Sequence, residues 1–185
     1  MSSLQKFHRR TNGSSAISPF PTIGSGSTTI GYWLGTAGDG TSKLIVAPQS
    51  TEGGNITWGS KSTIRYTQDI NDGLPNTNTL AGFGSTAHPA AYQCKNLTTG
   101  GYNTWYMPAK NELMTMYSNK GKAATQFNVS GTGYYYWSST EETRAQYSAN
   151  SAWTQCLGPG TVNSWGKTGG YGITYLVRAV RKTLV

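Results

Sequence analysis

Gly-Gly-Tyr-Asn-Thr-Trp-Tyr-Met-Pro-Ala-Lys-Asn-Glu-Leu-Met-Thr-Met-Tyr, residues 100–117, is the stretch that decides the fold. Trp105 and Met107 alternate as in a short buried strand, and Pro108 suits the first turn of a helix, where its missing N–H costs nothing. The helix would have one apolar face, at i, i+3 and i+4 spacing, formed by Leu113, Met116 and Tyr117. The stretch therefore predicts a strand that runs directly into a helix.

Glu112 lies in the first turn of this predicted helix, where the helix dipole favours a negative charge. Its neighbours are apolar, so a buried carboxylate here would need a cation. The closing segment Tyr175–Arg181 reads as a strand that contains two arginines. We therefore predict an ion pair between Glu112 and either Arg178 or Arg181.

A second strand is predicted at Tyr134–Glu141, which reads Tyr-Tyr-Tyr-Trp-Ser-Ser-Thr-Glu. Its hydroxyl groups could suggest a nucleophile, but a catalytic serine needs a positioned base, and the chain has only His8 and His88. The adjacent carboxylates Glu141 and Glu142 would point to opposite sides of a strand, so they make a poor acid–base pair. No catalytic residue is predicted.

The first half of the chain contains weaker signals. Residues Ile30–Pro48 predict a hairpin whose second strand is apolar enough to be central. Residues 49–80 read as a long polar excursion, with short strands expected at Thr57–Trp58 and Thr63–Tyr66. A first helix is predicted over Thr86–Leu97, with a proline in its first turn.

These segments, in this order, resemble the Lcl-type C-terminal domain, which is found at the ends of bacterial collagen-like adhesins and in phage virion proteins. The residues that carry the resemblance are 100–113, 136–141, Ala152-Trp153, Lys167 and 177–181, with 44–48 and 88–94 similar to marine and cyanobacterial phage structural proteins. The resemblance implies an α+β chain with a C-type lectin-like fold: two helices on short, mostly antiparallel sheets with long loops. Structural roles are expected for Trp105, Glu112, Trp137, Ser138, Arg178 and Arg181.

The chain is expected to have two parts, an N-terminal arm over residues 1–29 and the lectin-like domain over residues 30–185. The arm is rich in Ser, Gly and basic residues and has little to bury. It is interpreted as an extended docking arm that neighbouring subunits hold in place, and the alternative is that it folds back on its own domain. The residues expected to dock are Phe7, Arg9, Arg10 and Phe20.

Composition limits the partners. Only 12% of the 185 residues are charged, 24 are glycine, and the formal net charge of +8 is dispersed along the chain. This pattern predicts a general attraction to anionic surfaces and no sequence-specific nucleic-acid binding. No membrane span and no secretory signal is predicted, so the chain would reach the outside of a cell as part of a particle. The two cysteines, Cys94 and Cys156, can be bridged or can be buried thiols.

The region between the second predicted strand and the last is expected to form the ligand face. Aromatic rings there could stack on sugars while amides bind hydroxyl groups. The predicted ligand-binding residues are Asn150, Gln155, Asn163, Trp165, Lys167 and Tyr171. The competing interpretation is that Trp153 and Trp165 fill the core. No aspartate lies in this region, so no calcium, other metal or cofactor is predicted.

The sequence thus predicts a non-enzymatic phage virion structural protein. It would display the lectin-like domain on the particle, either as a tail-associated receptor binder or adhesin for host attachment, or as a capsid decoration or tail-fibre subunit. Expected partners are other virion proteins, further copies of the chain in a trimer, and a host-surface glycan or protein. The alternative is a free glycan-binding lectin or bacterial adhesin domain. Formylglycine-generating oxidases share the broad fold, but they depend on closely placed cysteines that are absent here.

Overall fold

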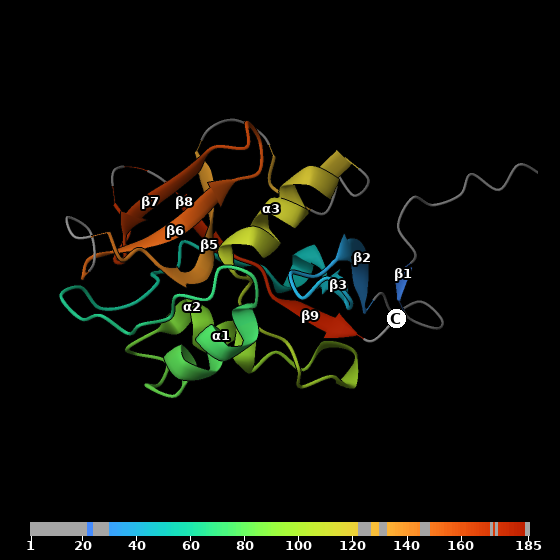
Figure 1. Ribbon diagram of the computed structural model, residues 1–185, viewed down its shortest axis with the longest axis horizontal. Coiled ribbons are helices and arrows are strands. Elements are labelled where there is room, and N and C mark those ends of the chain that lie inside the picture. Colours follow the sequence, from blue (N-terminus) through green and yellow to red (C-terminus); the bar gives the residue numbers. More distant parts are fainter. Residues whose placement is uncertain are drawn as a thin grey trace, which may run out of the picture.

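The computed structural model describes residues 22–23, 30–121, 127–129, 133–144, 149–170, 172 and 174–183. Within these ranges the chain is α+β, with two sheets and three α-helices (Figure 1), so the predicted fold class is confirmed. The arm residues Phe7, Arg9, Arg10 and Phe20 and the candidate ligand residue Tyr171 lie outside the described residues.

The first sheet has four antiparallel strands in the order β1-β2-β3-β9. The predicted hairpin is confirmed, because β2 pairs with β3, and β3 is central as expected. A bulge between Trp33 and Gly35 interrupts the β2–β3 ladder. The strands of this sheet are β1 (Thr22–Ile23), β2 (Gly31–Thr36), β3 (Lys43–Val46) and β9 (Val180–Thr183).

The second sheet has five strands in the order β4-β8-β5-β6-β7. It is mixed, because β5 and β8 are parallel and the other pairs are antiparallel. The aromatic strand β5 has the bounds that the sequence predicted. The strands are β4 (Gly53–Gly54), β5 (Tyr134–Glu141), β6 (Ser151–Cys156), β7 (Val162–Gly166) and β8 (Thr174–Val177).

The predicted last strand divides between the two sheets. Its first part is β8 and its last part is β9, and Arg178 and Ala179 lie between them. The buried guanidinium group of Arg178 donates to Glu52 Oε2 at 2.6 Å and to the carbonyl oxygen of Ala47 at 2.9 Å. This buried ion pair holds the chain where it passes from one sheet to the other, which is a structural role.

Helix α1 (Gly73–Ala81) was not predicted. Its sequence Gly-Leu-Pro-Asn-Thr-Asn-Thr-Leu-Ala is poor in strong helix formers, so tertiary contacts must supply its stability. The Asp72 side chain caps it by accepting from Leu74 N. At Gly73 the backbone meets the carbonyl oxygen of Met107 so closely that a Cβ atom would lie 2.2 Å from it. The excursion over 49–80 therefore contains a helix, and the two strands expected within 57–66 do not form.

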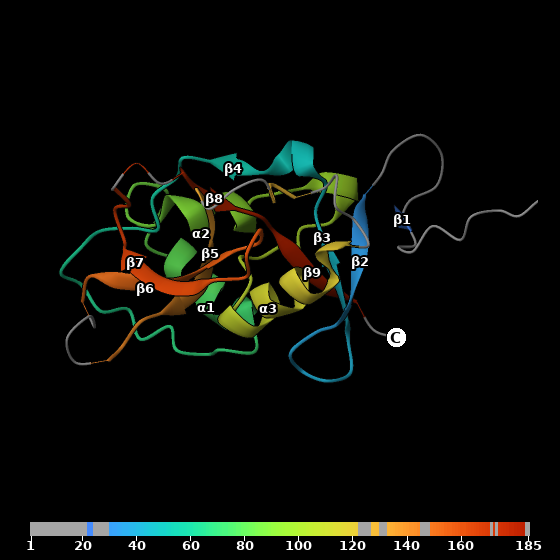
Figure 2. The same ribbon diagram turned by 90° about the horizontal axis from the view of Figure 1, so that it is seen from above.

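The other two helices are α2 (Pro89–Lys95) and α3 (Lys110–Asn119). Helix α2 has Pro89 in its first turn as predicted, but it begins at Pro89 and not at Thr86, and α3 begins two residues after Pro108. Figures 1 and 2 show α1 beside α2 on one side of the molecule, while α3 lies against β2, β5 and β6. The expected strand before α3 is a single bridge, in which Tyr106 and Val180 exchange two backbone hydrogen bonds of 2.8 Å.

The core is aromatic. Trp58, Trp105 and Trp137 are fully buried, and the Trp137 ring stacks on Tyr175 with centroids 4.5 Å apart. Cys94 and Cys156 are buried and are not joined by a disulfide, so the disulfide alternative is not realised. Burial raises the pKa of the Cys94 thiol far above its ordinary value, which makes it unreactive.

The predicted ion pair of Glu112 is wrong. Glu112 is fully buried, but its carboxylate accepts hydrogen bonds from neutral donors: Tyr106 Oη at 2.6 Å, Ala109 N at 2.8 Å and Gly73 N at 3.0 Å. Arg178 binds Glu52 instead, and the guanidinium group of Arg181 stacks 3.6 Å from the Tyr102 ring. Glu112 therefore joins the beginnings of α1 and α3.

The molecule has two distinct ends. Figures 1 and 2 show β1, β2 and the end of β9 at one end of the long axis. The loop that follows β4 lies at the opposite end. Residues 55–67 of that loop are called the display loop below.

Candidate functional site

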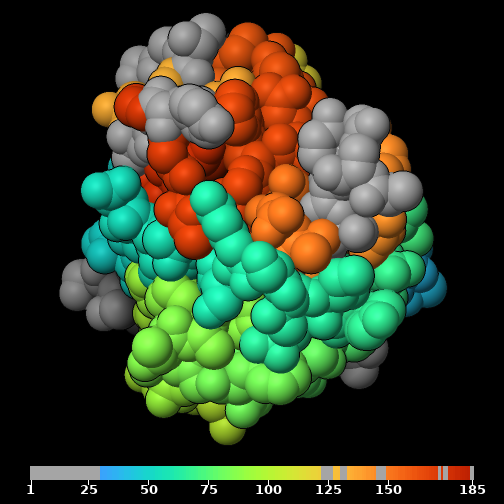
Figure 3. Space-filling model, turned by 90° about the vertical axis from the view of Figure 1, so that its left-hand side faces the viewer, coloured from blue at the N-terminus to red at the C-terminus, as the bar shows by residue number. Residues whose placement is uncertain are grey.

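The display loop has an unusual backbone. Within the described residues, the non-glycine residues with positive φ are Asn55 (51°), Ser62 (63°) and Tyr66 (58°), and all three lie in this loop. Such conformations are uncommon and persist only where the surroundings impose them. In Figure 3 the loop (teal) crosses one face of the molecule, between the orange and red strands and the green helical segments.

A buried ion pair between Lys167 and Glu141 holds the part of this loop that contains Tyr66. Both side chains are fully inaccessible to solvent. The Lys167 ammonium group donates to Glu141, to Thr63 O at 2.7 Å and to Ala149 O at 3.0 Å. The other carboxylate oxygen of Glu141 accepts from the backbone N–H groups of Arg65 and Tyr66, each at 2.8 Å. The pair thus fastens residues 63–66 of the display loop to the second sheet.

Lys167 was predicted to bind a ligand, and its burial corrects that prediction to a structural role. Burial lowers the pKa of Lys167, and the hydrogen bond and charge of Glu141 act in the opposite direction. The Lys167 backbone takes part as well, because its carbonyl oxygen accepts from Trp58 N at 2.8 Å. The ammonium group and the backbone carbonyl group of Lys167 thus both make hydrogen bonds inside the molecule.

The loop presents an aromatic and cationic surface. The Tyr66 side chain is among the most exposed large side chains described, at 75%. Beside it in sequence, the Arg65 guanidinium group lies 3.8 Å from the centre of the Phe83 ring, and Phe83 is itself 51% exposed. Tyrosine, phenylalanine and arginine are enriched at protein interfaces. We call Arg65, Tyr66 and Phe83 the display patch.

His88 fixes the orientation of Arg65. Its Nδ1 lies 3.3 Å from Trp58 O and its Nε2 lies 2.9 Å from Arg65 Nε. The Arg65 N–H donates, so Nε2 is the acceptor and Nδ1 carries the proton. Burial and the neighbouring cations lower the pKa of His88 to about 4, so the ring is neutral near pH 7. Gly59 is required here because a Cβ atom would lie 2.3 Å from His88 Nδ1.

The predicted ligand residues are only partly brought together. Asn150 and Trp165 line one shallow hollow, and Asn163 lines the next. Asn150 Oδ1 also accepts from Ser62 N at 3.0 Å, which links it to the display loop. Gln155 is 3% exposed and so is not presented on the surface, which corrects its predicted ligand role.

Neither of the two tryptophans of this region is fully buried in the core. Trp165 is half-buried and packs against the core, with its ring edge-on to Tyr135 at 6.0 Å. Trp153, for which the core was the competing interpretation, lies outside both core clusters. Its ring is 3.6 Å from Lys110 Nζ and 5.1 Å from the Arg144 guanidinium carbon.

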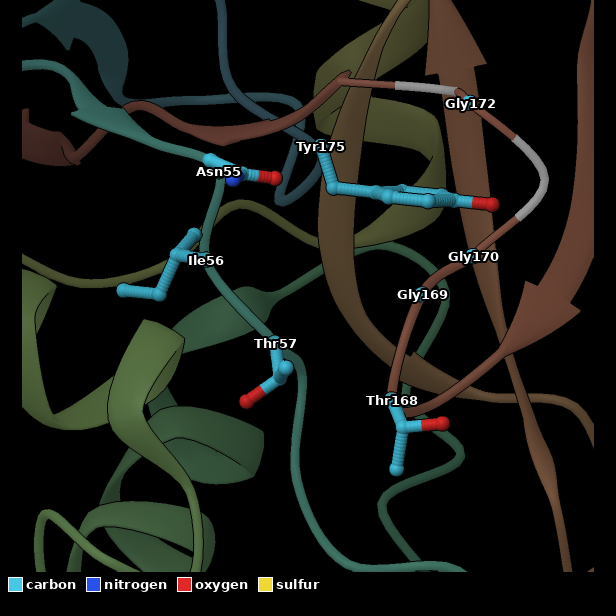
Figure 4. Close-up of a pocket in the computed structure, with 8 residues that line it drawn as sticks. All are labelled: Asn55, Ile56, Thr57, Thr168, Gly169, Gly170, Gly172 and Tyr175. Atoms are coloured by element: carbon cyan, nitrogen blue, oxygen red, sulfur yellow. The ribbon is translucent and has the colours of Figure 1, made fainter.

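A small pocket of about 240 Å³ opens beside the start of the display loop (Figure 4). The Tyr175 side chain reaches across it towards the glycine turn, and Thr57 and Thr168 line it from the two neighbouring segments. The described residues of its lining supply hydroxyl, amide and glycine groups and no charged side chain. Such a pocket suits a small neutral ligand with hydroxyl groups.

The hydroxyl groups that end β5 are structural. Ser138 Oγ accepts from Thr140 N at 3.2 Å, and Thr140 Oγ1 accepts from Lys110 N and donates to Asp69 O. Within the described ranges, no three His, Cys, Asp or Glu side chains gather as a metal site would require. No helix in the same ranges is long and apolar enough to cross a membrane.

One family model matches the chain. It describes the Lcl C-terminal domain and covers residues 50–181, which includes the display loop, Phe83, His88, Glu141 and Lys167. No curated protein matches the sequence.

Proposed function

Because the chain belongs to the Lcl C-terminal domain family, we propose that it is a non-enzymatic structural protein of a phage virion, which displays its lectin-like domain for attachment. The display patch would contact the host surface, as a tail-associated adhesin or a decoration of the capsid. The N-terminal arm would contact neighbouring virion subunits, and the chain would assemble as a trimer.

The observation that carries the proposal is the display loop. Its backbone has three strained positive-φ residues, a buried ion pair holds it to the second sheet, and it exposes the aromatic ring of Tyr66 to solvent. Three residues with positive φ cost roughly 1–3 kcal/mol each. A buried ion pair also costs desolvation energy, so it is weak evidence for stability. The structure uses both to keep the backbone of Arg65 and Tyr66 in one conformation. A loop prepared in this way loses less conformational entropy when it binds, which is what a contact surface requires.

The two ends of the molecule support the same assignment. The display loop lies at one end, and β1, through which the N-terminal arm joins the first sheet, lies at the other (Figures 1 and 2). A subunit held on a particle by its arm would therefore point the display patch outward. The dispersed positive charge adds a general attraction to anionic surfaces.

A free glycan-binding lectin or bacterial adhesin domain is the second candidate. The neutral, hydroxyl-lined pocket beside the display loop favours it, because amide and hydroxyl groups bind sugar hydroxyls. This candidate predicts that purified particles lack the chain and that a sugar which fills the pocket blocks binding.

Replacing Tyr66 with alanine tests the display patch. Tyr66 is mostly exposed, so its loss should leave the thermal midpoint unchanged, while a central aromatic contact is worth ~2 kcal/mol, or roughly thirtyfold in affinity. The measurement is the binding of the purified full chain to host cells. The control is Tyr102→Ala, which removes a tyrosine with 36% exposure whose ring packs on Arg181 of β9 and not on the display loop. Equal binding of the Tyr66 and Tyr102 variants would exclude the display patch as the contact surface.

A further inference from the structure

The two sheets have four edge strands, and three of these are protected against pairing with a further strand. The strands β1 and β4 have two residues each, which is too short to template another strand. The edge strand β9 carries Arg181 and Lys182, and Tyr106 already bonds to Val180 on its open side. The fourth edge, β7, is the exception.

Strand β7 has the features of an open template. Its sequence Val-Asn-Ser-Trp-Gly contains no charge and no proline, and its register with β6 runs through five residue pairs without a bulge. Proteins usually protect edges with charged residues, proline or bulges. Among the described residues, β7 pairs with β6 alone.

The ladder fixes which groups of β7 face outward. Cys156 N donates to Thr161 O and Lys167 N donates to Asn150 O, so residues 161, 163, 165 and 167 bond to β6. The backbone groups of Val162 and Ser164, and the N–H of Gly166, therefore point to the open edge, and Gly166 O accepts from Gly169 N. This row of donors and acceptors is the pattern that an added strand needs.

Two hollows lie along this edge and share Ser164. One, of about 410 Å³, is lined by Arg144, Trp153 and Val162 among others. The other, of about 490 Å³, is lined by Lys61, Trp165 and Gly166 among others. Side chains of an added strand that point to the same face are roughly 7 Å apart, so successive ones can reach successive hollows.

The charged side chains around the β7 edge indicate which kind of segment would bind there. Lys61 and Arg144 each line one hollow, and Lys110 lies against the Trp153 ring. The one carboxylate described among them is Glu142, which pairs with Arg144. Three cations and one anion leave the edge positive. A second copy of this edge would bring the same three cations and one carboxylate, so the two positive edges would repel each other.

We propose that β7 is a docking edge for an extended, acidic segment of a partner protein, which adds a sixth strand to the second sheet. Backbone hydrogen bonds to Val162 and Ser164 hold the segment, and two of its acidic side chains face Lys61 and Arg144. This site is separate from the display patch, so its failure would leave the proposed function intact.

The test is binding of the full chain to a labelled peptide in which Thr and Val alternate with Glu. Two control peptides replace each Glu with Lys or carry N-methyl groups on alternate residues, which blocks strand pairing. The key variant is Ser164→Pro, because the Ser164 N–H points outward and its loss removes no ladder bond. We expect about tenfold weaker binding for Ser164→Pro and for each control peptide, with an unchanged melting temperature.

A second variant keeps the test decisive if Ser164→Pro fails to fold. Lys61→Glu should weaken binding of the Glu peptide and strengthen binding of the Lys peptide. Equal binding of the Glu, Lys and N-methyl peptides would overturn the proposal. So would a concentration-dependent dimer that Ser164→Pro abolishes, because a second copy would then occupy the edge.

Discussion

Replacing Lys167 with methionine is expected to lower the free energy of unfolding by about 3–5 kcal/mol. Methionine fills a similar volume but leaves the Glu141 carboxylate buried without a cation, and it removes the donor to Thr63 O and Ala149 O. An uncompensated buried charge is among the most costly defects in a protein interior. The variant should also loosen the display loop near Thr63, because Thr63 O loses its donor and Glu141, which holds the N–H groups of Arg65 and Tyr66, loses its own partner.

Urea denaturation followed by tryptophan fluorescence measures this loss. The matched control is Arg144→Met, which also breaks a pair between a basic side chain and a glutamate, but one whose arginine side chain is 60% exposed. The Glu142 side chain of this pair is 2% exposed, so its loss should cost more than that of a fully exposed pair, but less than Lys167→Met, because water can reach the place of the exposed arginine. The double variant Lys167→Met with Glu141→Gln should recover part of the loss, since no charge is then left buried. A Lys167→Met variant as stable as Arg144→Met would show that the ion pair does not hold the loop.

Replacing Glu112 with leucine should cost about 3 kcal/mol or more. Three donors, from Gly73, Ala109 and Tyr106, would lose their acceptor, and each buried unpaired donor costs roughly 1–3 kcal/mol. Glu112→Gln is the matched control, because it keeps a carbonyl oxygen that can accept from the two backbone N–H groups. It should cost much less. Leucine and glutamine variants of equal stability would mean that these hydrogen bonds do not stabilise the fold.

The same residue should make stability depend on pH. Burial raises the pKa of Glu112 from its ordinary 4.5 to about 7, against the effect of its hydrogen bonds. The folded state therefore holds the proton more tightly, so this contribution is complete below pH 4.5 and is lost as the pH rises to about 7. His88 acts in the opposite direction, because its pKa falls from 6.5 to about 4 and its contribution is lost as the pH decreases through that window.

The effect of Glu112 must therefore be measured as a difference. Subtracting the pH profile of Glu112→Gln from that of the unmodified chain removes the contribution of His88. The difference in unfolding free energy should decrease between pH 4.5 and 7. A flat difference would mean that Glu112 has the same pKa in the folded and unfolded states.

Much of the fold could be predicted because its signals are local. The alternation and aromatic content of Tyr134–Glu141 indicated both bounds of β5. The preference of proline for the first turn of a helix located α2, and it placed the start of α3 two residues before its observed start. The order of these motifs along the chain is enough to indicate the Lcl-type family, and the family match confirms it.

The elements that could not be predicted depend on contacts between distant residues. Helix α1 has a poor helix sequence and forms because its first residue packs on Met107 and its Thr77 hydroxyl bonds Met107 O at 3.1 Å. The division of the last strand is decided by Arg178, whose partner Glu52 lies in a loop with no pattern of its own. The spacing of residues along the sequence does not reveal the contact of α1 with Met107 or the pairing of Arg178 with Glu52.

The candidate site was missed for the same reason. The sequence directed attention to residues 149–172, where tryptophan and amide side chains gather. Lys167 supports the site as a buried residue under the display loop. The exposed residues of the site are Arg65, Tyr66 and Phe83. The positive φ of Tyr66 and the burial of Glu141 cannot be predicted from composition or from hydrophobic periodicity. One available signal was the adjacent Arg65 and Tyr66 in an otherwise polar loop.

The most direct measurement is electron microscopy of purified particles with a gold label at position 66, introduced as Tyr66→Cys, and in a separate sample at position 183, introduced as Thr183→Cys. Because the display loop and the end of β9 lie at opposite ends of the molecule (Figure 1), we predict the position-66 label at a larger radius than the position-183 label. Particles without the chain, or a position-66 label on the inner side, would contradict the account.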